Sequence, residues 1–369
     1  MNASAILESV SVDLGERSYP IYIGSGIRAD LPGVCREHRV AEKIVIVTDR
    51  NVSRHHLKRV SRSLSDAGYR VMPVVVPSGE RQKSLSRVSR IVTEMLEHGV
   101  QRRSALMALG GGVIGDLAGF VAATYQRGIQ LIQLPTSLLA QVDSSIGGKV
   151  GVNHPLAKNM IGAFYQPLFV WSDVEVLKTL PRREVVCGLG EVVKYGIIRD
   201  PDLFSHLEKN LDTILSLDRK DILHMLRRCA LIKADIVAQD EREQGIRIVL
   251  NCGHTIGHAL EHAGEYRKLK HGEAVMHGLL AEGFIARELG ILSATDFQRI
   301  SNLISRMPIP RNLSSLKPSA ILRAMARDKK ALADQVRFVL PCCIGETQVV
   351  EGIDLTLIKR SLAMLLGKR

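Results

Sequence analysis

The chain has 369 residues, of which 46% are hydrophobic and 24% are charged, and its formal net charge is +12. This length predicts two to three domains, and the composition is typical of a globular protein rather than a disordered or fibrous one. No apolar run approaches the ~20 residues that a membrane-spanning helix needs, so no membrane partner is expected. The N-terminus has neither a basic start nor an unbroken apolar segment, which argues against secretion.

The charge and the cysteines narrow the class of protein further. The positive charge would suit a nucleic-acid-binding protein, but aromatic residues make up only 4% of the chain and no such motif is visible. An anionic small-molecule substrate explains the basic residues more simply. The six cysteines are scattered without a CxxC pair, which favours a reducing, cytoplasmic compartment.

Alternating residues near the start predict a strand pair at 6–12 and 19–23. β-branched runs then alternate with amphipathic stretches, which indicates a mostly parallel, Rossmann-like α/β sheet. The expected strands are 43–49, 71–76, 105–109 and 129–134. One expected helix follows the first of these strands and ends near residue 68, and two others span 84–98 and 117–125. From about 181 helical periodicity dominates. We therefore expect an α/β domain at 1–180 and an all-α domain at 181–369, with the active site in the cleft between them.

The first chemical motif is rich in glycine. Gly110, Gly112 and Gly115 follow a predicted strand and open a predicted helix, as a dinucleotide-binding motif requires. Glycine lets the backbone approach a pyrophosphate, whose charge the helix N-terminus stabilises. No acid follows about 20 residues later, so Asp49 at the end of the first long strand is the better ribose ligand. A tight strand–helix turn without a ligand is the alternative.

Residues 136–166 are predicted to form a long, ordered polar loop. The segment carries several glycines together with Asp143, Lys149, Lys158 and Asn159. Loops of this length in compact domains are usually functional, which favours a binding role over a solvated surface loop.

Histidines are concentrated between residues 247 and 275, where four of the twelve in the chain occur. Asn251, His254 and His258 are spaced to share one helix face, with Asn251 suited to the N-cap, and His271 follows a polar loop. Imidazole is the commonest protein metal ligand, and catalytic zinc takes three protein ligands. The pattern therefore suits a metal site, although no HExxH motif is present. Solvated or hydrogen-bonded helix histidines are the alternative.

Other residues fit the same interpretation. Gly253 and Gly257 are expected to leave room for something bulky to approach the helix. Glu191 and Lys194 share a helix face, where Glu191 would be the third metal ligand and Lys194 a substrate cation, the alternative being a surface ion pair. Lys233 falls on an apolar helix stripe. A snorkelling side chain is the ordinary explanation, and an inward lysine would need an anion such as a substrate.

Several long, ordered motifs resemble those of the 3-dehydroquinate synthases of the shikimate pathway. They are GGGVIGD, PTSLLAQVDSSIGGKVGVNHPLAKNMIGAFYQP, TLPRREVVCGLGEVVKYG, LNCGHTIGHALE, HGEAV and DKK. The resemblance extends from the strand before Asp49 to Lys330, and it implies an NAD-binding α/β domain followed by a helical metal- and substrate-binding domain. Ser137, Cys187 and Gly190 depart slightly from the family pattern, but they remove no group that the chemistry needs.

The resemblance also assigns roles to residues. It places the ligands of one divalent metal ion, Zn2+ or Co2+, at Glu191, His254 and His271. It places substrate contacts at Arg127, Asp143, Lys149, Lys158, Asn159, Lys194, Lys233, Arg247, Asn251, His258 and one lysine of the Asp328-Lys329-Lys330 run, with Lys330 preferred. It places NAD contacts at Asp49, Glu80, Lys83, Gly112, Val113, Asp116, Thr136, Ser137, Lys149, Lys158 and Thr179.

The family converts 3-deoxy-D-arabino-heptulosonate 7-phosphate into 3-dehydroquinate and phosphate. The steps are a transient oxidation by NAD, phosphate elimination, reduction and an intramolecular aldol closure. The resemblance implies that the lysines and arginines hold the substrate carboxylate and phosphate as charge-assisted donors, and that His258 relays a proton. It also implies a homodimer.

Two related classes remain as alternatives. Other sugar-phosphate cyclases, such as 2-deoxy-scyllo-inosose synthase and the sedoheptulose 7-phosphate cyclases, use NAD and a metal on substrates without this carboxylate. The joint presence of Lys233, Arg247, Asn251 and the DKK lysines favours the acidic substrate. The iron-dependent alcohol and glycerol dehydrogenases have a similar fold and would release NADH, but they generally lack this lysine set and the HGEAV motif.

Overall fold

The structure is a computed structural model that describes residues 6–328 and 336–367, and the chain divides into two compact units. Unit 1 comprises residues 1–181 and 217–242, and unit 2 comprises residues 182–216 and 243–369. The segment 217–242, expected in the helical domain, thus belongs with the sheet. The predicted substrate contact Lys330 lies outside the described residues.

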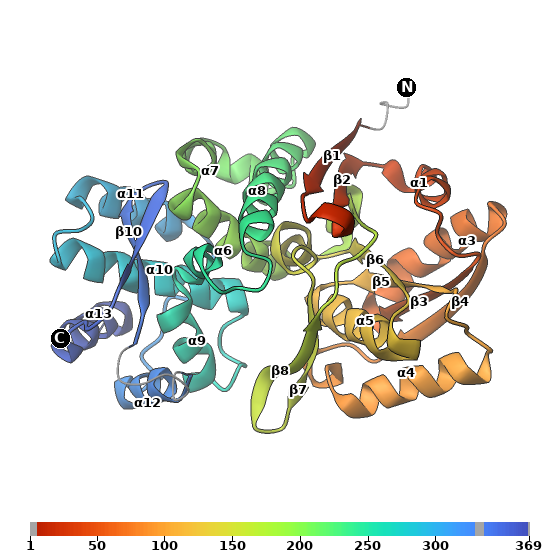
Figure 1. Ribbon diagram of the computed structural model, residues 1–369. Helices are drawn as coiled ribbons and strands as arrows, with labels where there is room; N and C mark the ends of the chain where they lie inside the picture. Colours follow the sequence, from red (N-terminus) through yellow and green to blue (C-terminus); the bar gives the residue numbers. More distant parts are fainter. Residues whose placement is uncertain (1–5, 329–335, 368–369) are drawn as a thin grey trace. The chain divides into compact units, whose positions relative to one another are not determined.

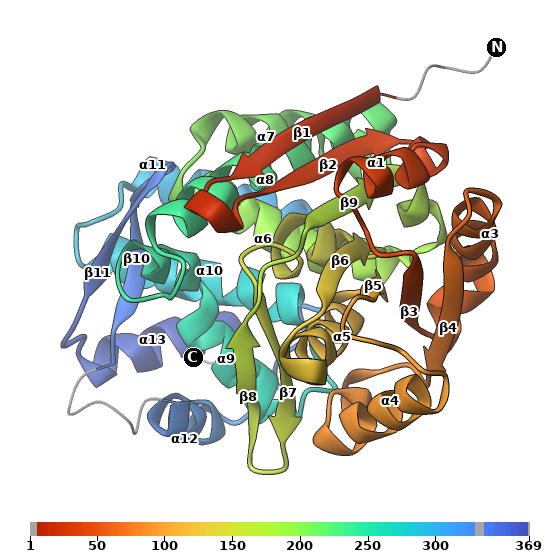
Figure 2. The ribbon, with the colours of Figure 1, turned by 45° about the vertical axis from the view of Figure 1, so that its right-hand side comes forward.

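Unit 1 is built on a seven-stranded sheet with the strand order β1-β2-β9-β6-β5-β3-β4 (Figure 2). β1 and β2 pair antiparallel, as expected, and the other neighbours pair parallel. The predicted mostly parallel architecture is therefore confirmed. The strands are β1 Ile6–Val12, β2 Tyr19–Ser25, β3 Lys43–Asp49, β4 Arg70–Val76, β5 Ala105–Gly110, β6 Gln130–Pro135 and β9 Phe169–Asp173.

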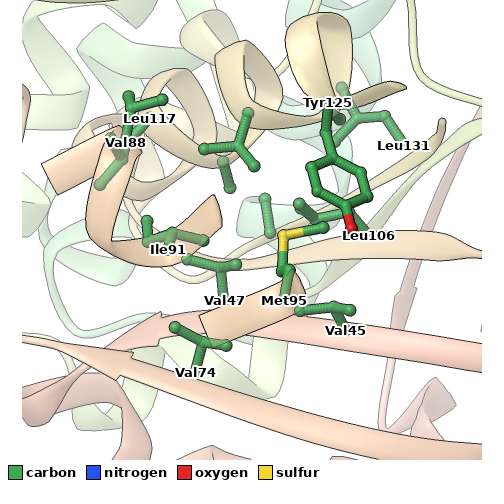
Figure 3. Packing of buried hydrophobic residues seen from close by; sticks show 14 of the residues in the cluster. Val45, Val47, Val74, Val88, Ile91, Met95, Leu106, Leu117, Tyr125 and Leu131 are labelled. Carbon is green, nitrogen blue, oxygen red and sulfur yellow. The ribbon is translucent and has the colours of Figure 1, made fainter. Parts of the chain in front are cut away.

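The central strands are mainly apolar and mostly buried because both faces of the sheet are covered. In β3, Val45 and Val47 point into one core cluster, whereas Ile44 and Ile46 point into the other. Figure 3 shows the first cluster, in which Val45 and Val47 lie beside side chains of α4 and α5. The helices of unit 1 are α1 Leu31–Glu37, a helix from Arg50 to Asp66 that contains a π turn at Ser53–Leu57, α4 Leu85–Glu97, α5 Gly112–Thr124 and α8 Arg219–Gln239.

The polar segment 136–166 is mostly regular structure, so the prediction of a loop was wrong. It contains a helical turn at Ala140–Ser144 and an antiparallel hairpin of β7 Lys149–His154 and β8 Ala157–Phe164. Val150 and Val152 of β7 are buried in the sheet core. The glycines that suggested a loop instead allow close strand pairing, because a methyl group on Gly151 would lie 2.6 Å from the carbonyl oxygen of Ile161.

Unit 2 is mainly helical, as predicted, and α10 packs against α6, α9, α11 and α13 (Figure 1). A hairpin that the sequence did not predict also packs on α10. None of the helices within the described ranges is both long and apolar enough to cross a membrane. The elements are α6 Arg182–Ile198, α7 Pro201–Leu215, a 3-10 turn at Ile246–Asn251, α9 His254–Ala263, α10 His271–Glu288, α11 Ala294–Arg306, α12 Pro318–Asp328, β10 Phe338–Cys343, β11 Glu346–Val350 and α13 Leu355–Leu366.

Candidate functional site

Glycines bring α6 and α10 of unit 2 into backbone contact. A methyl group on Gly272 would lie 1.7 Å from the carbonyl oxygen of Cys187, and one on Gly190 would lie 2.4 Å from the carbonyl oxygen of Gly272. Only glycine permits such an approach. Because Glu191 and His271 are the immediate neighbours of these glycines, the helix contact also brings their side chains together.

The contact between α9 and α10 has the same cause. A methyl group on Gly278 would lie 1.8 Å from the carbonyl oxygen of Gly253, and one on Gly257 would lie 3.1 Å from that of Ala274. The room that these two glycines leave is filled by α10, with the Leu279 side chain and the Val275 carbonyl oxygen at Gly253 and backbone atoms at Gly257. The expectation that something bulky approaches these glycines is confirmed, and the group that approaches is helix α10.

The N-cap of α9 is Gly253, with φ 79°, and not Asn251 as the sequence suggested. Glu282 of α10, which is fully buried, accepts hydrogen bonds from the backbone N–H groups of Gly253 (2.5 Å) and Ile256 (3.2 Å). A carboxylate from the neighbouring helix thus satisfies the first N–H groups of α9, so a local capping side chain is not needed. Asn251 lies at the end of the preceding 3-10 turn.

The three predicted metal ligands are gathered by these contacts. Oε1 of Glu191 lies 3.5 Å from Nε2 of His254 and 3.4 Å from Nε2 of His271. Ligands at 2.0–2.1 Å in a tetrahedral zinc site are roughly 3.4 Å apart, so the spacing fits such an ion. His258 is also close, with its ring centroid 5.0 Å from that of His254, and the nitrogens of the three histidines lie within 4.8 Å of one another.

Both predicted histidine ligands are oriented by a second partner. Nδ1 of His254 lies 3.1 Å from the carbonyl oxygen of Cys252, and Nδ1 of His271 lies 3.0 Å from Oε2 of Glu261. These acceptors favour a proton on Nδ1 and leave Nε2 for a metal ion, as is usual for metal-binding histidines. Sequence reasoning did not identify Glu261, although it follows His258 by three residues on the same helix.

The electrostatics of the cluster suit a cation. Burial lowers the pKa of His254 well below its usual value, and the Lys194 ammonium lowers it further. Burial also lowers the pKa of His271, but its hydrogen bonds to Glu191 and Glu261 outweigh this effect and raise the pKa to about 10. The position between these carboxylates therefore favours positive charge, and the donor set of two imidazoles and one carboxylate fits a divalent ion.

Three further predicted substrate residues belong to unit 2. Lys194 is buried and forms an ion pair with Glu191, so the pair is not a surface one. Arg247 is fully buried and Asn251 is half-buried, both in the 3-10 turn against which α6 packs. Lys194 is thus close in sequence to Glu191, and Arg247 and Asn251 are close in sequence to His254.

In unit 1, most predicted NAD residues lie at or just after the carboxyl ends of adjacent parallel strands. The chain runs from β3 outward to β4, then returns to the other side of β3 at β5, so the strand order reverses between β3 and β5. Ligands of open α/β sheets bind outside the strand ends at such a reversal. Asp49 ends β3 there, and its Oδ1 accepts hydrogen bonds from the Asn51 N–H (2.7 Å) and the Ser78 hydroxyl (2.8 Å).

The glycine motif lies on the other side of this reversal. β5 ends at Gly110 and α5 begins at Gly112, which places Gly112 and Val113 in the first turn of the helix. Thr136 and Ser137 follow the end of β6, and the Thr136 N–H donates to the carbonyl oxygen of Gly110 at 2.9 Å. The context that a dinucleotide-binding motif needs, a strand followed directly by a helix N-terminus, is therefore present.

A second group of predicted residues connects the turn after β4 with α5 and the hairpin. Nζ of Lys83, which is buried, lies 2.5 Å from Oδ2 of Asp116 and also donates to Oδ1 of Asn159. Burial raises the pKa of Asp116 to about 6, against the opposing effect of the Lys83 ammonium. Glu80 accepts a hydrogen bond from Asn153, a residue that sequence reasoning did not identify.

The remaining predicted residues of unit 1 fall into two groups. Lys233 does not snorkel, because it is buried and its Nζ lies 2.6 Å from Oδ1 of Asp143. Thr179 lies within hydrogen-bonding distance of the buried His56, 2.8 Å from its Nε2. The others are exposed cations, namely Arg127 in a left-handed turn with φ 66°, and Lys149 and Lys158 on the hairpin.

Comparison with known proteins identifies the family. Residues 73–187 match the 3-dehydroquinate synthase N-terminal family, and residues 188–331 match the 3-dehydroquinate synthase C-terminal family. The chain belongs to the 3-dehydroquinate synthase family. A 3-dehydroquinate synthase of Desulforamulus reducens is 48% identical over 346 residues, which cover 94% of this chain and 96% of that protein.

Solved structures share the fold over nearly the whole chain. A 2-deoxy-scyllo-inosose synthase complexed with carbaglucose-6-phosphate, NAD+ and Co2+ has a TM-score of 0.89 and 25% identity, covering 98% of this chain and 100% of its own. The 2-epi-5-epi-valiolone synthase ValA of Streptomyces hygroscopicus subsp. jinggangensis 5008, with NAD+ and Zn2+ bound, has a TM-score of 0.86 and 24% identity, covering 100% and 99%.

Proposed function

We propose that this protein is a 3-dehydroquinate synthase that converts 3-deoxy-D-arabino-heptulosonate 7-phosphate into 3-dehydroquinate and phosphate, with NAD and a divalent metal ion as cofactors. The observation that carries the proposal is the cluster of Glu191, His254 and His271, whose facing atoms are 3.4 to 3.5 Å apart. Membership of the family supplies the reaction, and the cluster supplies the donor atoms that the metal would need.

Glu191, His254 and His271 would hold the metal ion, and the residues at the carboxyl edge of the unit 1 sheet would hold NAD. When bound, NAD accepts and returns a hydride, and the metal ion lowers the pKa of a substrate hydroxyl group. Glu261 and the Cys252 carbonyl keep the two imidazoles in the orientation that presents Nε2. His258, beside both ligands, is suited to move the proton of that hydroxyl group.

The substrate carries a carboxylate and a phosphate, and the candidate residues offer matching cations. We assign Lys149, Lys158 and Lys233 of unit 1, and Lys194 and Arg247 of unit 2, as donors to these anionic groups. Lys194 and Lys233 are buried beside Glu191 and Asp143, so each is held in place by a carboxylate before substrate arrives. Buried donors that are already oriented lose little conformational entropy on binding.

One assay tests the proposal and separates its alternatives. The purified protein is incubated with the heptulosonate phosphate, NAD+ and Zn2+ or Co2+, while phosphate and NADH are both measured. We expect phosphate release without accumulation of NADH, because the hydride returns within each turnover. Accumulating NADH would instead identify a dehydrogenase. Phosphate release from sedoheptulose 7-phosphate or glucose 6-phosphate, but not from the acidic substrate, would identify a different cyclase.

We further propose a cytoplasmic homodimer without nucleic-acid partners. The basis is the family resemblance, the scattered cysteines and the lack of nucleic-acid-binding motifs. All six cysteines are in the free thiol form, four of them buried. Light scattering during size-exclusion chromatography measures the mass directly, and a mass of one chain would contradict the dimer.

A further inference from the structure

A ring of hydrogen bonds joins predicted NAD residues to predicted substrate residues, and Asn153 of β7 is its central member. The Asn153 side chain donates from Nδ2 to Oε1 of Glu80 at 2.7 Å and accepts at Oδ1 from the backbone N–H of Asn159 at 2.9 Å. Its backbone N–H donates to the carbonyl oxygen of Lys83 at 2.9 Å. Lys83 closes the ring by donating from Nζ to Oδ1 of Asn159.

The ring holds Asn159 in a conformation that few residues adopt. Its φ is 57°, in the left-handed region that is unfavourable for a residue with a side chain, although asparagine tolerates it better than most. Such backbone persists where the surrounding contacts determine it, and here those contacts come from Asn153 and Lys83.

We infer that Asn153 is a positioning residue that couples NAD binding to substrate binding. This inference rests on the proposed function, because that function places Glu80 and Lys83 against NAD and Lys158 and Asn159 against substrate. A ligand that fixes Glu80 also fixes the amide of Asn153, and through it the backbone of Asn159. Each ligand then lowers the cost of ordering the other's residues, so the affinity gain is reciprocal.

Asparagine suits this position because it offers one donor and one acceptor on a short side chain. The Asn159 N–H needs an acceptor and the Glu80 carboxylate needs a donor, which fixes the orientation of the amide. Asn153→Asp keeps the acceptor toward Asn159 but places a carboxylate against Glu80 and removes that bond. In the double variant Glu80→Gln with Asn153→Asp, the glutamine amide donates to the new carboxylate and restores the connection with the opposite polarity.

The experiment measures the coupling itself. NAD+ is titrated calorimetrically into the zinc-loaded, full-length protein, with and without saturating 3-dehydroquinate. We expect the product to tighten NAD+ binding roughly 5- to 10-fold in the wild type, and to change it less than about twofold in Asn153→Asp. The double variant should recover most of the wild-type factor. Asn302→Asp, the same change on the exposed face of α11, is the control and should keep the wild-type factor.

Each outcome has a defined meaning. Unchanged coupling in Asn153→Asp, no coupling in the wild type, or a loss that Glu80→Gln does not restore would each overturn the inference. Asn153→Ser, which removes both side-chain bonds without adding charge, serves as a second variant if Asn153→Asp does not fold, and its coupling should also fall below about twofold. A wild type that does not turn over the heptulosonate phosphate would overturn the proposed function instead.

Discussion

The candidate residues of the two units are assembled in different ways. In unit 1 most predicted NAD residues follow the ends of parallel strands, where hydrogen bonding between the strands sets the spacing. Long side chains such as Lys83 connect them. In unit 2 the proposed metal ligands lie on three helices, and their spacing is set where α6, α9 and α10 touch through Gly190, Gly272 and Gly278. Glu191 and His271 meet because the helix backbones meet.

This difference predicts where each site is fragile. Packed helix axes are ordinarily 8–10 Å apart, and the glycine contacts of unit 2 let the backbones of α6, α9 and α10 touch. A glycine at such a contact can therefore matter as much for metal binding in unit 2 as a metal ligand does. In unit 1, the pairing of the strands keeps the backbone of the sheet in place when one side chain is lost.

The sharpest test of the comparison is Gly272→Ala. The added methyl group would meet the carbonyl oxygen of Cys187 at 1.7 Å, so α6 and α10 must separate. We expect unit 2 to lose at least about 3 kcal/mol of stability, as severe overpacking does, and the protein to lose bound zinc. Thermal unfolding and metal analysis measure both effects.

The matched control for this prediction is Gly33→Ala in α1, where an added methyl group meets no atom within 4 Å. It should leave zinc content unchanged and stabilise the helix slightly. If the Gly272→Ala variant had the zinc content and the unfolding temperature of the wild type, the two helices would be able to separate at little cost. The contrast between the two units would then disappear.

The second prediction removes a proposed ligand without disturbing the helix contact. His271→Ala should weaken zinc or cobalt binding more than about 100-fold, since even partners of metal ligands contribute 10- to 100-fold. NAD+ binding to unit 1 should change less than about twofold. His262→Ala, an exposed histidine of α9, is the control. Full metal stoichiometry in the His271 variant, measured after dialysis, would contradict the ligand assignment.

Much of unit 1 could be predicted because its signals are local. The run KIVIVTD contains four consecutive apolar, β-branched residues, and it forms a strand buried on both faces. The glycine motif was identified in its strand–helix context for the same reason. The hairpin at 149–164 was missed because its polar and glycine residues resemble those of a loop, whereas the buried side of the pattern rests on Val150 and Val152.

Contacts between distant residues could not be predicted from local patterns. Glu282 caps α9 from 29 residues beyond Gly253, and Lys233 meets Asp143 across 90 residues. The apolar stripe of α8 indicated a buried face, but not that β1 and β2 would cover it. The histidine cluster was found by its spacing and composition, yet the role of the neighbouring glycines depended on which backbone approached them.

A third prediction concerns the orientation of His271. Glu261→Gln keeps an acceptor for Nδ1 but removes the charge that makes the imidazole a stronger donor to a metal. We expect cobalt binding to weaken about tenfold and the visible absorption spectrum of the cobalt protein to shift. Glu265→Gln, at an exposed position in the following turn, is the control. An unchanged spectrum and affinity would mean that Glu261 only fills space.

The smallest expected effect lies in unit 1 and depends on pH. Burial, together with nearby positive groups, lowers the pKa of His56 to about 4, against 6.5 for an ordinary histidine. Between these values the unfolded chain binds more protons than the folded one, so the free energy of unfolding falls as the pH falls through this window.

Urea unfolding at pH 7 and pH 5 measures this contribution. Of the wild-type loss between these two values, His56 should account for roughly 2 kcal/mol, and His56→Gln should lack that part because glutamine does not titrate. His55→Gln, an exposed neighbour, should lose as much stability as the wild type. An equal loss in His56→Gln would show that His56 is protonated at little cost. The surroundings of His56, which lies beside Thr179, would then adjust to a buried charge. Unit 1 would in that case be less rigid than the comparison of the two units assumes.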